Sequence, residues 1–133
     1  MDPVSVLDAN AVIWFLDGDA RGAGLATRLE RAQKGKERLL MSQVNWGEVV
    51  LAALRAGGDA LAAEALAILD RLPIEVVPTD RGLTLQAASF KARGGIAYAD
   101  CFAAALALRE KAVVITGDPE FKVVSDVVKV QWL

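Results

Sequence analysis

The chain alternates between short apolar runs and longer segments that carry apolar residues at every third or fourth position. Short apolar runs bounded by turn residues are typical of buried strands, and the wider spacing is typical of amphipathic helices. The short runs predict five strands, at residues 4–7, 38–41, 74–77, 112–115 and 127–131. The spaced segments predict helices at residues 11–16, 25–34, 42–56, 59–72, 81–93 and 98–110.

Residues at the ends of these segments support the predicted boundaries. Ser42 and Asp80 carry side chains that cap the first turn of a helix, and each precedes a predicted helix. Gly57 and Gly58 supply the backbone freedom with which helices commonly end. Pro73 follows another predicted helix and stops it, because proline cannot continue a helical hydrogen-bond pattern.

Strands that alternate with helices predict parallel pairing through right-handed crossovers. The predicted strands are apolar along most of their length, as a sheet covered on both faces requires. No repeat, linker or low-complexity tract interrupts the pattern, so we expect one domain over residues 1–133. The predicted fold class is α/β, a three-layer α/β/α sandwich around a central, mainly parallel sheet of four to five strands. Ligands of such sheets bind beyond the carboxyl ends of the strands, where the strand order reverses.

Composition narrows the setting of the protein. The hydrophobic fraction of 54% suits a covered sheet and also hints at an apolar interface between copies of the chain. No apolar stretch reaches the roughly 18 residues of a membrane span. No basic residue precedes the first apolar run, as it would in a secretory signal. Cys101 is the only cysteine, which excludes an intramolecular disulfide, so a cytoplasmic location is expected.

The chain contains no histidine. This excludes Ser-His-Asp and Cys-His catalysis, histidine general bases and histidine metal ligands. Any catalysis must therefore use carboxylates, hydroxyls, lysine, arginine or a metal ion. The net charge is −2, but without the four acids described next the basic residues outnumber the remaining acids. That balance is compatible with a polyanionic substrate that is held through metal ions.

Four acids occupy positions where a carboxylate needs a partner. Asp8 follows the first predicted strand, and Asp118 comes shortly after the fourth. Glu48 and Asp100 lie in predicted helices that are otherwise mostly apolar. An acid at the end of a buried strand or on the inner face of a helix must be neutralised, hydrogen-bonded or bound to a cation.

Each acid also has an ordinary interpretation when it is taken alone. Asp8 and Asp100 suit the first turn of a helix, and Asp118 lies in a Thr-Gly-Asp-Pro turn. Glu48 has only a weak alternative, a pairing with Arg55 one turn beyond the usual contact. The joint pattern outweighs these separate interpretations and predicts that all four acids meet at one site.

Carboxylates that share a crevice predict a divalent metal site. Two unit charges 4 Å apart repel by about 4 kcal/mol at an effective dielectric constant of 20, so cations are needed between them. Mg²⁺ and Mn²⁺ prefer such oxygen ligands and can activate a water for phosphodiester hydrolysis. Asn10 and Thr116 lie two residues from Asp8 and Asp118 and are candidate supporting groups. Both are also common as helix-start and turn residues.

Four motifs in order resemble a known family. They are Val-Leu-Asp8-Ala-Asn-Ala-Val, Ser-Gln-Val-Asn-Trp-Gly-Glu48-Val, Tyr-Ala-Asp100-Cys-Phe-Ala-Ala-Ala-Leu-Ala and Val-Ile-Thr-Gly-Asp118-Pro-Glu-Phe. In order and separation they are similar to the motifs of PIN-domain ribonucleases, most closely the VapC-type toxins of bacterial and archaeal toxin–antitoxin pairs. The resemblance extends over essentially the whole chain.

The resemblance implies an endoribonuclease toxin of a VapBC-type pair, which hydrolyses RNA through a water activated by Mg²⁺ or Mn²⁺. It also implies a homodimer and a VapB-type antitoxin that occludes the site. By position, Asp8, Asp100 and Asp118 would face the metal, and Glu48 would join them or position the attacking water. Glu120 stands where some relatives place another acid.

Two other functions fit the same residues. One is a PIN-like housekeeping nuclease for RNA processing or DNA flaps that has no antitoxin. The other is a catalytically silent PIN-fold module that binds a protein or RNA.

The sequence indicates the surfaces that bind substrate and partners less precisely than it indicates the acids. Basic residues are candidates for contacts with phosphates, namely Arg21, Arg28, Lys91 and Arg93. Trp46 either stacks on a base or belongs to the core, and Cys101 is interpreted as a small buried filler. The helical segments 60–72 and 83–92 either form a groove for a dimer or antitoxin or pack against the sheet.

Overall fold

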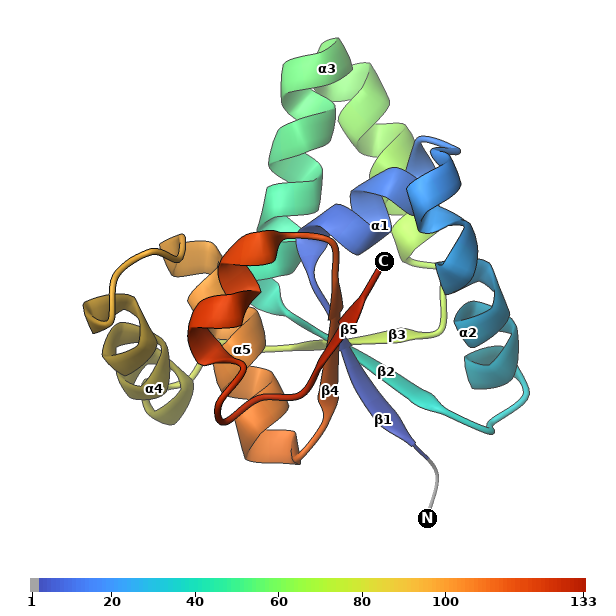
Figure 1. Cartoon of the computed structure of the whole chain (residues 1–133). Helices are drawn as coiled ribbons and strands as arrows, with labels where there is room; N and C mark the ends of the chain where they lie inside the picture. The colour runs from blue at the N-terminus through green and yellow to red at the C-terminus, as the bar shows by residue number, and fades with distance from the viewer. Residues whose placement is uncertain (1–2) are drawn as a thin grey trace.

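The computed structural model describes residues 3–133 and shows a sheet of five parallel strands (Figure 1). The strands are β1 (Val4–Leu7), β2 (Arg38–Ser42), β3 (Ile74–Val77), β4 (Val113–Thr116) and β5 (Val130–Trp132). Their order is β3-β2-β1-β4-β5. The chain moves outward from β1 to β3, then returns to the other side of β1 with β4, so the strand order reverses between β1 and β4. The predicted fold class is confirmed.

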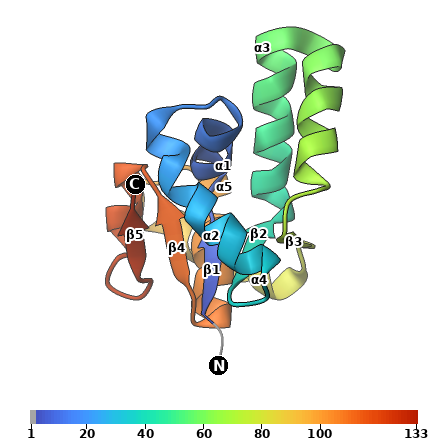
Figure 2. The same ribbon diagram turned by 90° about the vertical axis from the view of Figure 1, so that its right-hand side faces the viewer.

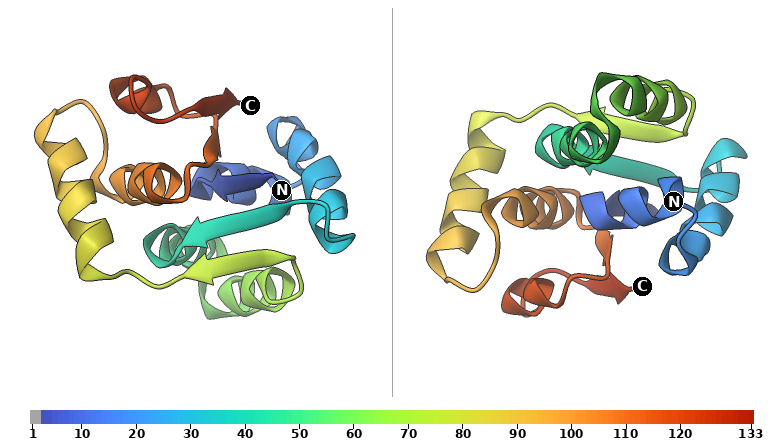
Figure 3. Two further views of the ribbon diagram at one scale, coloured as in Figure 1. Left: turned by 90° about the horizontal axis from the view of Figure 1, so that it is seen from below. Right: turned by 90° about the horizontal axis from the view of Figure 1, so that it is seen from above.

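Helices cover both faces of the sheet. They are α1 (Ala9–Leu16), α2 (Ala23–Gln33), α3 (Gln43–Leu69), α4 (Arg81–Ala92) and α5 (Tyr98–Glu110), with short 3₁₀ helices η1 (Ala20–Gly22) and η2 (Pro119–Val124). Figure 3 shows α5, with α4 outside it, on one side of the sheet and α2 on the other. The arrangement places three layers of secondary structure around two apolar cores.

Alternate side chains of the strands point into different cores. Val6 and Val114 pack with α4 and α5, whereas their neighbours Leu7 and Ile115 pack with α1, α2 and α3. All four side chains are fully buried. Successive strand residues point to opposite faces of the sheet, and both faces are buried. The strands are therefore continuous apolar runs in the sequence.

The long helix α3 is a hairpin of two helical arms. Its backbone leaves the helical region at Gly57 and at Gly58, where φ is 68° and ψ is −158°. Only glycine adopts that second conformation readily. Figure 2 shows the two arms side by side beyond the carboxyl ends of the strands. The predicted helix end at this glycine pair is confirmed.

The last two strands differ from their predicted bounds. Strand β4 extends to Thr116, one residue further than expected, and β5 begins at Val130 rather than at residue 127. Val128 is only 3% exposed but belongs to a turn, because its N–H donates to the carbonyl of Val124 at 2.9 Å. The segment before Val130 is therefore apolar because it is buried, although it does not pair with a strand. Trp132 pairs with Thr116, and the N–H of Leu133 donates to the Thr116 carbonyl at 2.9 Å.

No helix within residues 3–133 is both long enough and apolar enough to cross a membrane.

Candidate metal centre

The strand reversal brings the ends of β1 and β4 side by side, with Leu7 opposite Ile115. Asp8 follows β1 directly, and its N–H donates to the carbonyl of Ile115 at 3.1 Å. Its side chain is 1% exposed and also caps α1, because Oδ1 accepts the N–H of Ala9 at 2.7 Å. The capping interpretation and the metal-ligand interpretation are thus compatible, since one carboxylate oxygen performs the cap.

Thr116 connects the two strand ends. Its hydroxyl donates to Oδ2 of Asp8 at 2.7 Å and accepts the backbone N–H of Asp118 at 3.0 Å. The Thr116 side chain is fully buried, so these contacts hold both acids in one orientation. Its supporting role at a metal centre stays a prediction.

Two helices bring further acids to the same point. Glu48 comes from the first arm of α3, and Asp100 comes from the first turn of α5. Asp8, Glu48 and Asp100 each offer a carboxylate oxygen, and these oxygens lie within 4.8 Å of one another. Asp100 is 6% exposed, and its place at a helix N-terminus partly offsets its charge. Acids from three separate elements therefore converge.

A second trio shares Asp100. Its members are Asp100, Asp118 and Glu120, whose carboxylate oxygens also lie within 4.8 Å of one another. Asp118 caps η2, because its Oδ1 accepts the N–H of Glu120 at 2.9 Å. Glu120 in turn accepts the N–H of Ala97 at 2.7 Å and so links η2 to the start of α5. All four predicted acids and Glu120 meet at one end of the sheet.

Sequence reasoning missed Asn45, which is fully buried beside the acids. Its amide Nδ2 donates to Oε1 of Glu48 at 3.0 Å and to the carbonyl of Ala99 at 3.1 Å. Its Oδ1 accepts the hydroxyl of Ser42 at 2.6 Å. Asn45 thus holds Glu48 and the residue before Asp100 together. Its position one helical turn before Glu48 was the available signal.

The other predicted neighbours occupy simpler places. Asn10 is half-buried in the first turn of α1, and within residues 3–133 its side chain makes none of the hydrogen bonds that join the acids. Its supporting role stays a prediction. Trp46 is half-buried against the core between the sheet and α1, α2 and α3. Cys101 is fully buried, as predicted for a filler, and burial raises the pKa of its thiol.

A tryptophan closes one side of the Thr116–Asp118 turn. A Cβ added to Gly117 would lie 2.3 Å from Cη2 of Trp14, so only glycine fits under the ring. The guanidinium of Arg21 lies over the same ring, 4.2 Å from its centroid. Arg21 is also bonded to Asp19 at 2.7 Å. Among the basic residues predicted to contact phosphates, Arg21 therefore packs on Trp14, whose ring lies against Gly117 beside Asp118.

The remaining basic candidates have other partners. Arg28 donates to Glu37 at 2.7 Å and to Ser5 at 3.2 Å near the start of β1, and its contact with phosphates stays a prediction. Lys91 donates to the carbonyl of Ile96 at 2.8 Å, and Arg93 pairs with Asp126 at 2.7 Å. Helical spacing alone could not distinguish the two ends of the sheet.

Crowding of carboxylates changes their protonation. Burial raises the pKa of Asp8 from 3.8 to about 6, against the lowering effect of its hydrogen bonds to Thr116 and Ala9. Burial, followed by the charge of Asp8 and the carboxylate of Asp118, raises the pKa of Asp100 from 3.8 to about 9. Closely placed carboxylates resist ionising together, and a cation between them removes that resistance.

Comparison with known proteins agrees with this geometry. The family model of the PIN domain matches residues 5–127. The chain belongs to the PIN domain family. Among curated proteins, none matches the sequence significantly. The assignment therefore comes from the family pattern and from the fold.

Solved structures with this PIN fold include toxin–antitoxin proteins. VapBC2 from Rickettsia felis, solved with a DNA fragment of its promoter, has a TM-score of 0.73 and 15% identity over 96% of this chain and 97% of that chain. VapC20 from Mycobacterium tuberculosis, a toxin that cleaves the sarcin–ricin loop, has a TM-score of 0.70 and 22% identity over 96% and 98%. A toxin–antitoxin complex from Klebsiella pneumoniae has a TM-score of 0.65 and 14% identity over 88% and 89%. At these identities the likeness shows the fold.

Proposed function

We propose that this PIN domain is an endoribonuclease that depends on Mg²⁺ or Mn²⁺ and hydrolyses phosphodiester bonds of RNA. The observation that carries the proposal is the convergence of Asp8, Glu48 and Asp100, whose carboxylate oxygens lie within 4.8 Å of one another. The absence of histidine from the chain leaves metal-assisted hydrolysis as the chemistry that best fits these side chains. Membership of the PIN domain family supports a nuclease.

The donor set suits a hard divalent cation. Every donor is a carboxylate oxygen, the ligand type that Mg²⁺ and Mn²⁺ prefer. In the proposal, Asp8, Asp100 and Asp118 are the ligands, and Glu48 joins them or positions the attacking water. When bound, the ion would acidify that water and stabilise the oxygen that leaves the phosphorus.

The chain's own residues fix the positions of these acids. Thr116 and the N–H of Ala9 each occupy one oxygen of Asp8, which prevents rotation of the carboxylate. Asn45 occupies Oε1 of Glu48. The hydroxyl of Thr116 also holds the backbone of Asp118. Such pre-organisation lowers the reorganisation needed when substrate and ion bind.

Cleavage of RNA by defined variants tests the catalytic proposal. We expect RNA cleavage in Mg²⁺ or Mn²⁺, loss of cleavage in EDTA, and at least a hundredfold lower rate for Asp8→Asn and Asp100→Asn. Asp59→Asn is the matched control, because Asp59 is an exposed acid in the α3 hairpin. Equal cleavage by all four proteins would eliminate the proposed centre.

Calorimetric titration with Mn²⁺ tests the alternative of a catalytically silent binding module. The nuclease proposal expects Mn²⁺ to bind the wild type and Asp59→Asn but not Asp100→Asn. A folded wild-type protein that neither binds Mn²⁺ nor cleaves RNA would favour the silent module.

We further propose that the protein is the toxin of a VapBC-type pair, acts as a homodimer and is neutralised by a VapB-type antitoxin. Solved structures of the same fold that are toxin–antitoxin proteins support this partner. A groove of about 200 Å³ between α1 and the α3 hairpin has the apolar character that an amphipathic helix of an antitoxin requires. It is lined by Ile13, Leu16, Val49, Ala53, Leu61 and Ile68, among others.

A small reading frame beside the gene decides between the toxin and the housekeeping nuclease. The toxin proposal expects its product to abolish RNA cleavage at an equimolar ratio and to relieve growth arrest on co-expression. Light scattering of the protein alone would test the homodimer. Efficient cleavage by a protein that has no such neighbour and causes no growth arrest would favour the housekeeping role.

A further inference from the structure

A large cavity lies at the opposite end of the sheet from the acids. Its volume is about 870 Å³, and its walls come from the start of β1, the exposed side of α2, the end of α5 and the segment before β5. Pockets of 300–1,000 Å³ are typical for small ligands. Neither the fold nor the proposed nuclease chemistry requires a cavity here.

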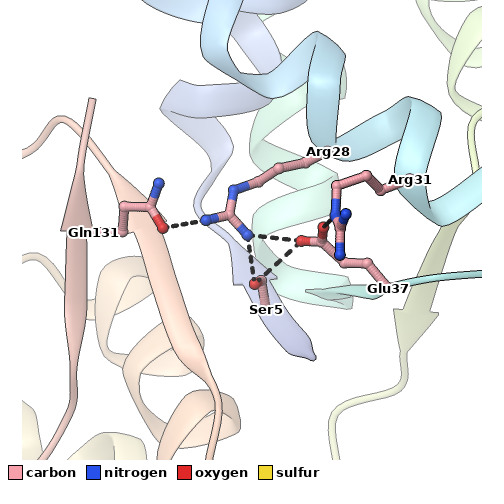
Figure 4. Close-up of polar contacts among 5 residues, drawn as sticks. All are labelled: Ser5, Arg28, Arg31, Glu37 and Gln131. Atoms are coloured by element: carbon pink, nitrogen blue, oxygen red, sulfur yellow. Dashed lines mark hydrogen bonds and ion pairs between the residues drawn. The ribbon is translucent and has the colours of Figure 1, made fainter. Parts of the chain in front are cut away.

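Charged residues form a network on one wall of this cavity (Figure 4). Arg28 donates from Nη1 to Oε1 of Glu37 at 2.7 Å and to the hydroxyl of Ser5 at 3.2 Å, and from Nη2 to Oε1 of Gln131. Arg31 donates to the other oxygen of Glu37 at 3.2 Å. Glu37 is 4% exposed and Ser5 is 3% exposed. The two buried residues therefore anchor arginine side chains that reach the cavity.

The lining carries an excess of positive charge. Arg28, Arg31, Lys111 and Lys129 all line the cavity, and Glu37 is the single acid among the lining residues of the described chain. Both oxygens of Glu37 are already occupied by the arginines. Within residues 3–133, no acid forms an ion pair with either lysine. Such a site favours an anion with several acceptor oxygens.

The opposite wall is apolar. Val4, Leu108, Val113 and Val127 contribute to it, and Val127 is 46% exposed. A wall of branched aliphatic side chains suits a flat or apolar body rather than a bare inorganic ion. The cavity thus combines a basic side with a surface for a sugar or a base.

Lys111 supplies an independent observation. It is the only non-glycine residue of the described chain with positive φ, at 52°, and it ends α5 in the left-handed conformation. Glycine is the usual residue at such helix ends, because a side chain there is strained. The Lys111 side chain is exposed and lines the cavity, so this strained position places a positive charge there.

We propose that this cavity binds the phosphate group of a nucleotide, either free or at an RNA end. Arg31, Lys111 and Lys129 hold the phosphate oxygens, and the nucleoside lies against the apolar wall. Arg28 is held in place by Glu37 and Ser5 and completes the basic side. The proposal does not depend on the nuclease function, because the acids lie at the other end of the strands.

Calorimetric titration of the full chain with AMP, in EDTA, tests the site. We expect AMP to bind and adenosine, which lacks the phosphate, to bind at least tenfold more weakly. Lys111→Gly should weaken AMP binding at least fivefold while raising the melting temperature by roughly 3–6 °C, because it removes the backbone strain. Arg31→Gln should weaken binding similarly. Lys122→Gln and Arg81→Gln, exposed basic residues outside the lining, are the matched controls.

Competition identifies the source of the phosphate. A short RNA with a 5′-phosphate that displaces AMP would assign the site to RNA ends, and its failure to do so would assign the site to free nucleotides. Asp100→Asn should bind AMP like the wild type, which separates this result from that of the nuclease test. The absence of AMP binding, or AMP binding that Lys111→Gly and Arg31→Gln leave unchanged, would overturn the proposal.

Discussion

Asn45 links the two helices that carry Glu48 and Asp100, through a single amide group. Asn45→Asp keeps the size of the side chain but places an oxygen against Glu48 and the carbonyl of Ala99. We expect at least tenfold slower RNA cleavage, weaker Mn²⁺ binding and a loss of about 1–3 kcal/mol in the free energy of unfolding. Chemical denaturation and calorimetry measure these effects.

Ser42→Ala provides the comparison for this prediction. It removes the cap of α3 and the hydrogen bond to Oδ1 of Asn45, but it keeps both hydrogen bonds that Nδ2 of Asn45 donates. It should lower the free energy of unfolding by about 0.5–2 kcal/mol while changing Mn²⁺ affinity little. Similar Mn²⁺ affinities for the two variants would contradict a positioning role of Asn45.

Gly117 is a second residue that its neighbours constrain, because only a residue without a side chain fits against Trp14. Gly117→Ala would place a methyl group 2.3 Å from the ring of Trp14 and should lower the free energy of unfolding by about 1–3 kcal/mol. The shift of the adjacent Asp118 should also slow RNA cleavage. In a double-mutant cycle, Trp14→Leu should remove most of the effect of Gly117→Ala on stability. Strict additivity of the two substitutions would refute the proposed clash.

Single site residues could be predicted where their position follows from neighbouring residues in the sequence. Asp8, Thr116 and Asp118 stand at strand ends, and strand ends can be located from the apolar pattern alone. Asn45 could not be predicted in the same way, because it bonds to Ala99, 54 positions away in the chain. Its importance arises from the packing of α3 beside α5.

Among the elements, the α3 hairpin depends on the left-handed backbone of Gly58. A Cβ at Gly58 or at Gly47 would meet no atom within 4 Å, so substitutions at these positions differ in backbone effect rather than in packing. Gly58→Ala should lower the free energy of unfolding by about 1–3 kcal/mol, because its φ of 68° disfavours a side chain. Gly47→Ala, inside the helical arm, should raise it by about 0.5–1 kcal/mol. Urea denaturation that gave both changes the same sign would contradict this account.

Element types were easier to predict than the ends of the last strands. The glycine pair and the caps at Ser42 and Asp80 mark helix boundaries through local chemistry. Asp118 and Pro119 mark the start of η2, but no glycine or proline lies between η2 and β5 to mark where β5 begins. Val124 and Val128 are buried in the core although they lie in η2 and the following turn, so an apolar run there did not imply strand pairing.

For the whole molecule, the crowded acids make stability depend on pH. Asp8 and Asp100 have folded-state pKa values of about 6 and about 9, above the ordinary 3.8. Protonation therefore favours the folded state, and the free energy of unfolding should fall as pH rises from about 4 to about 9. The lowered pKa values of Asp19, Asp80 and Asp126 act only at more acidic pH.

Thermal unfolding in EDTA between pH 5 and 9 measures this dependence. Asp100→Asn should flatten the profile and raise the free energy of unfolding above pH 6 by roughly 1–2 kcal/mol, although we expect it to slow RNA cleavage at least a hundredfold. Mn²⁺ should raise the melting temperature of the wild type more at pH 8 than at pH 6, since its ligands must lose protons. A metal-free profile that rises with pH would contradict the crowding of these acids.

The overall architecture followed from the alternation of strands and helices, but the strand order did not. Placing β4 beside β1 was a condition for Asp8 and Asp118 to meet, and periodicity could not supply it. The same missing information left Arg28 unplaced: its partner Ser5 lies near the start of β1, whereas its partner Gln131 pairs with Ile115 near the carboxyl end of β4. The local sequence pattern therefore predicts the strands and helices, but it does not predict which strands pair with one another.

Strand β5 pairs with Thr116, the residue whose hydroxyl donates to Asp8. Trp132 and Leu133 engage the backbone of Thr116 from the outer edge of the sheet. We therefore expect that a purification tag fused directly after Leu133, or a deletion of these two residues, disturbs the end of the sheet at which the acids meet. Recombinant versions intended for kinetic work are better extended at the other terminus.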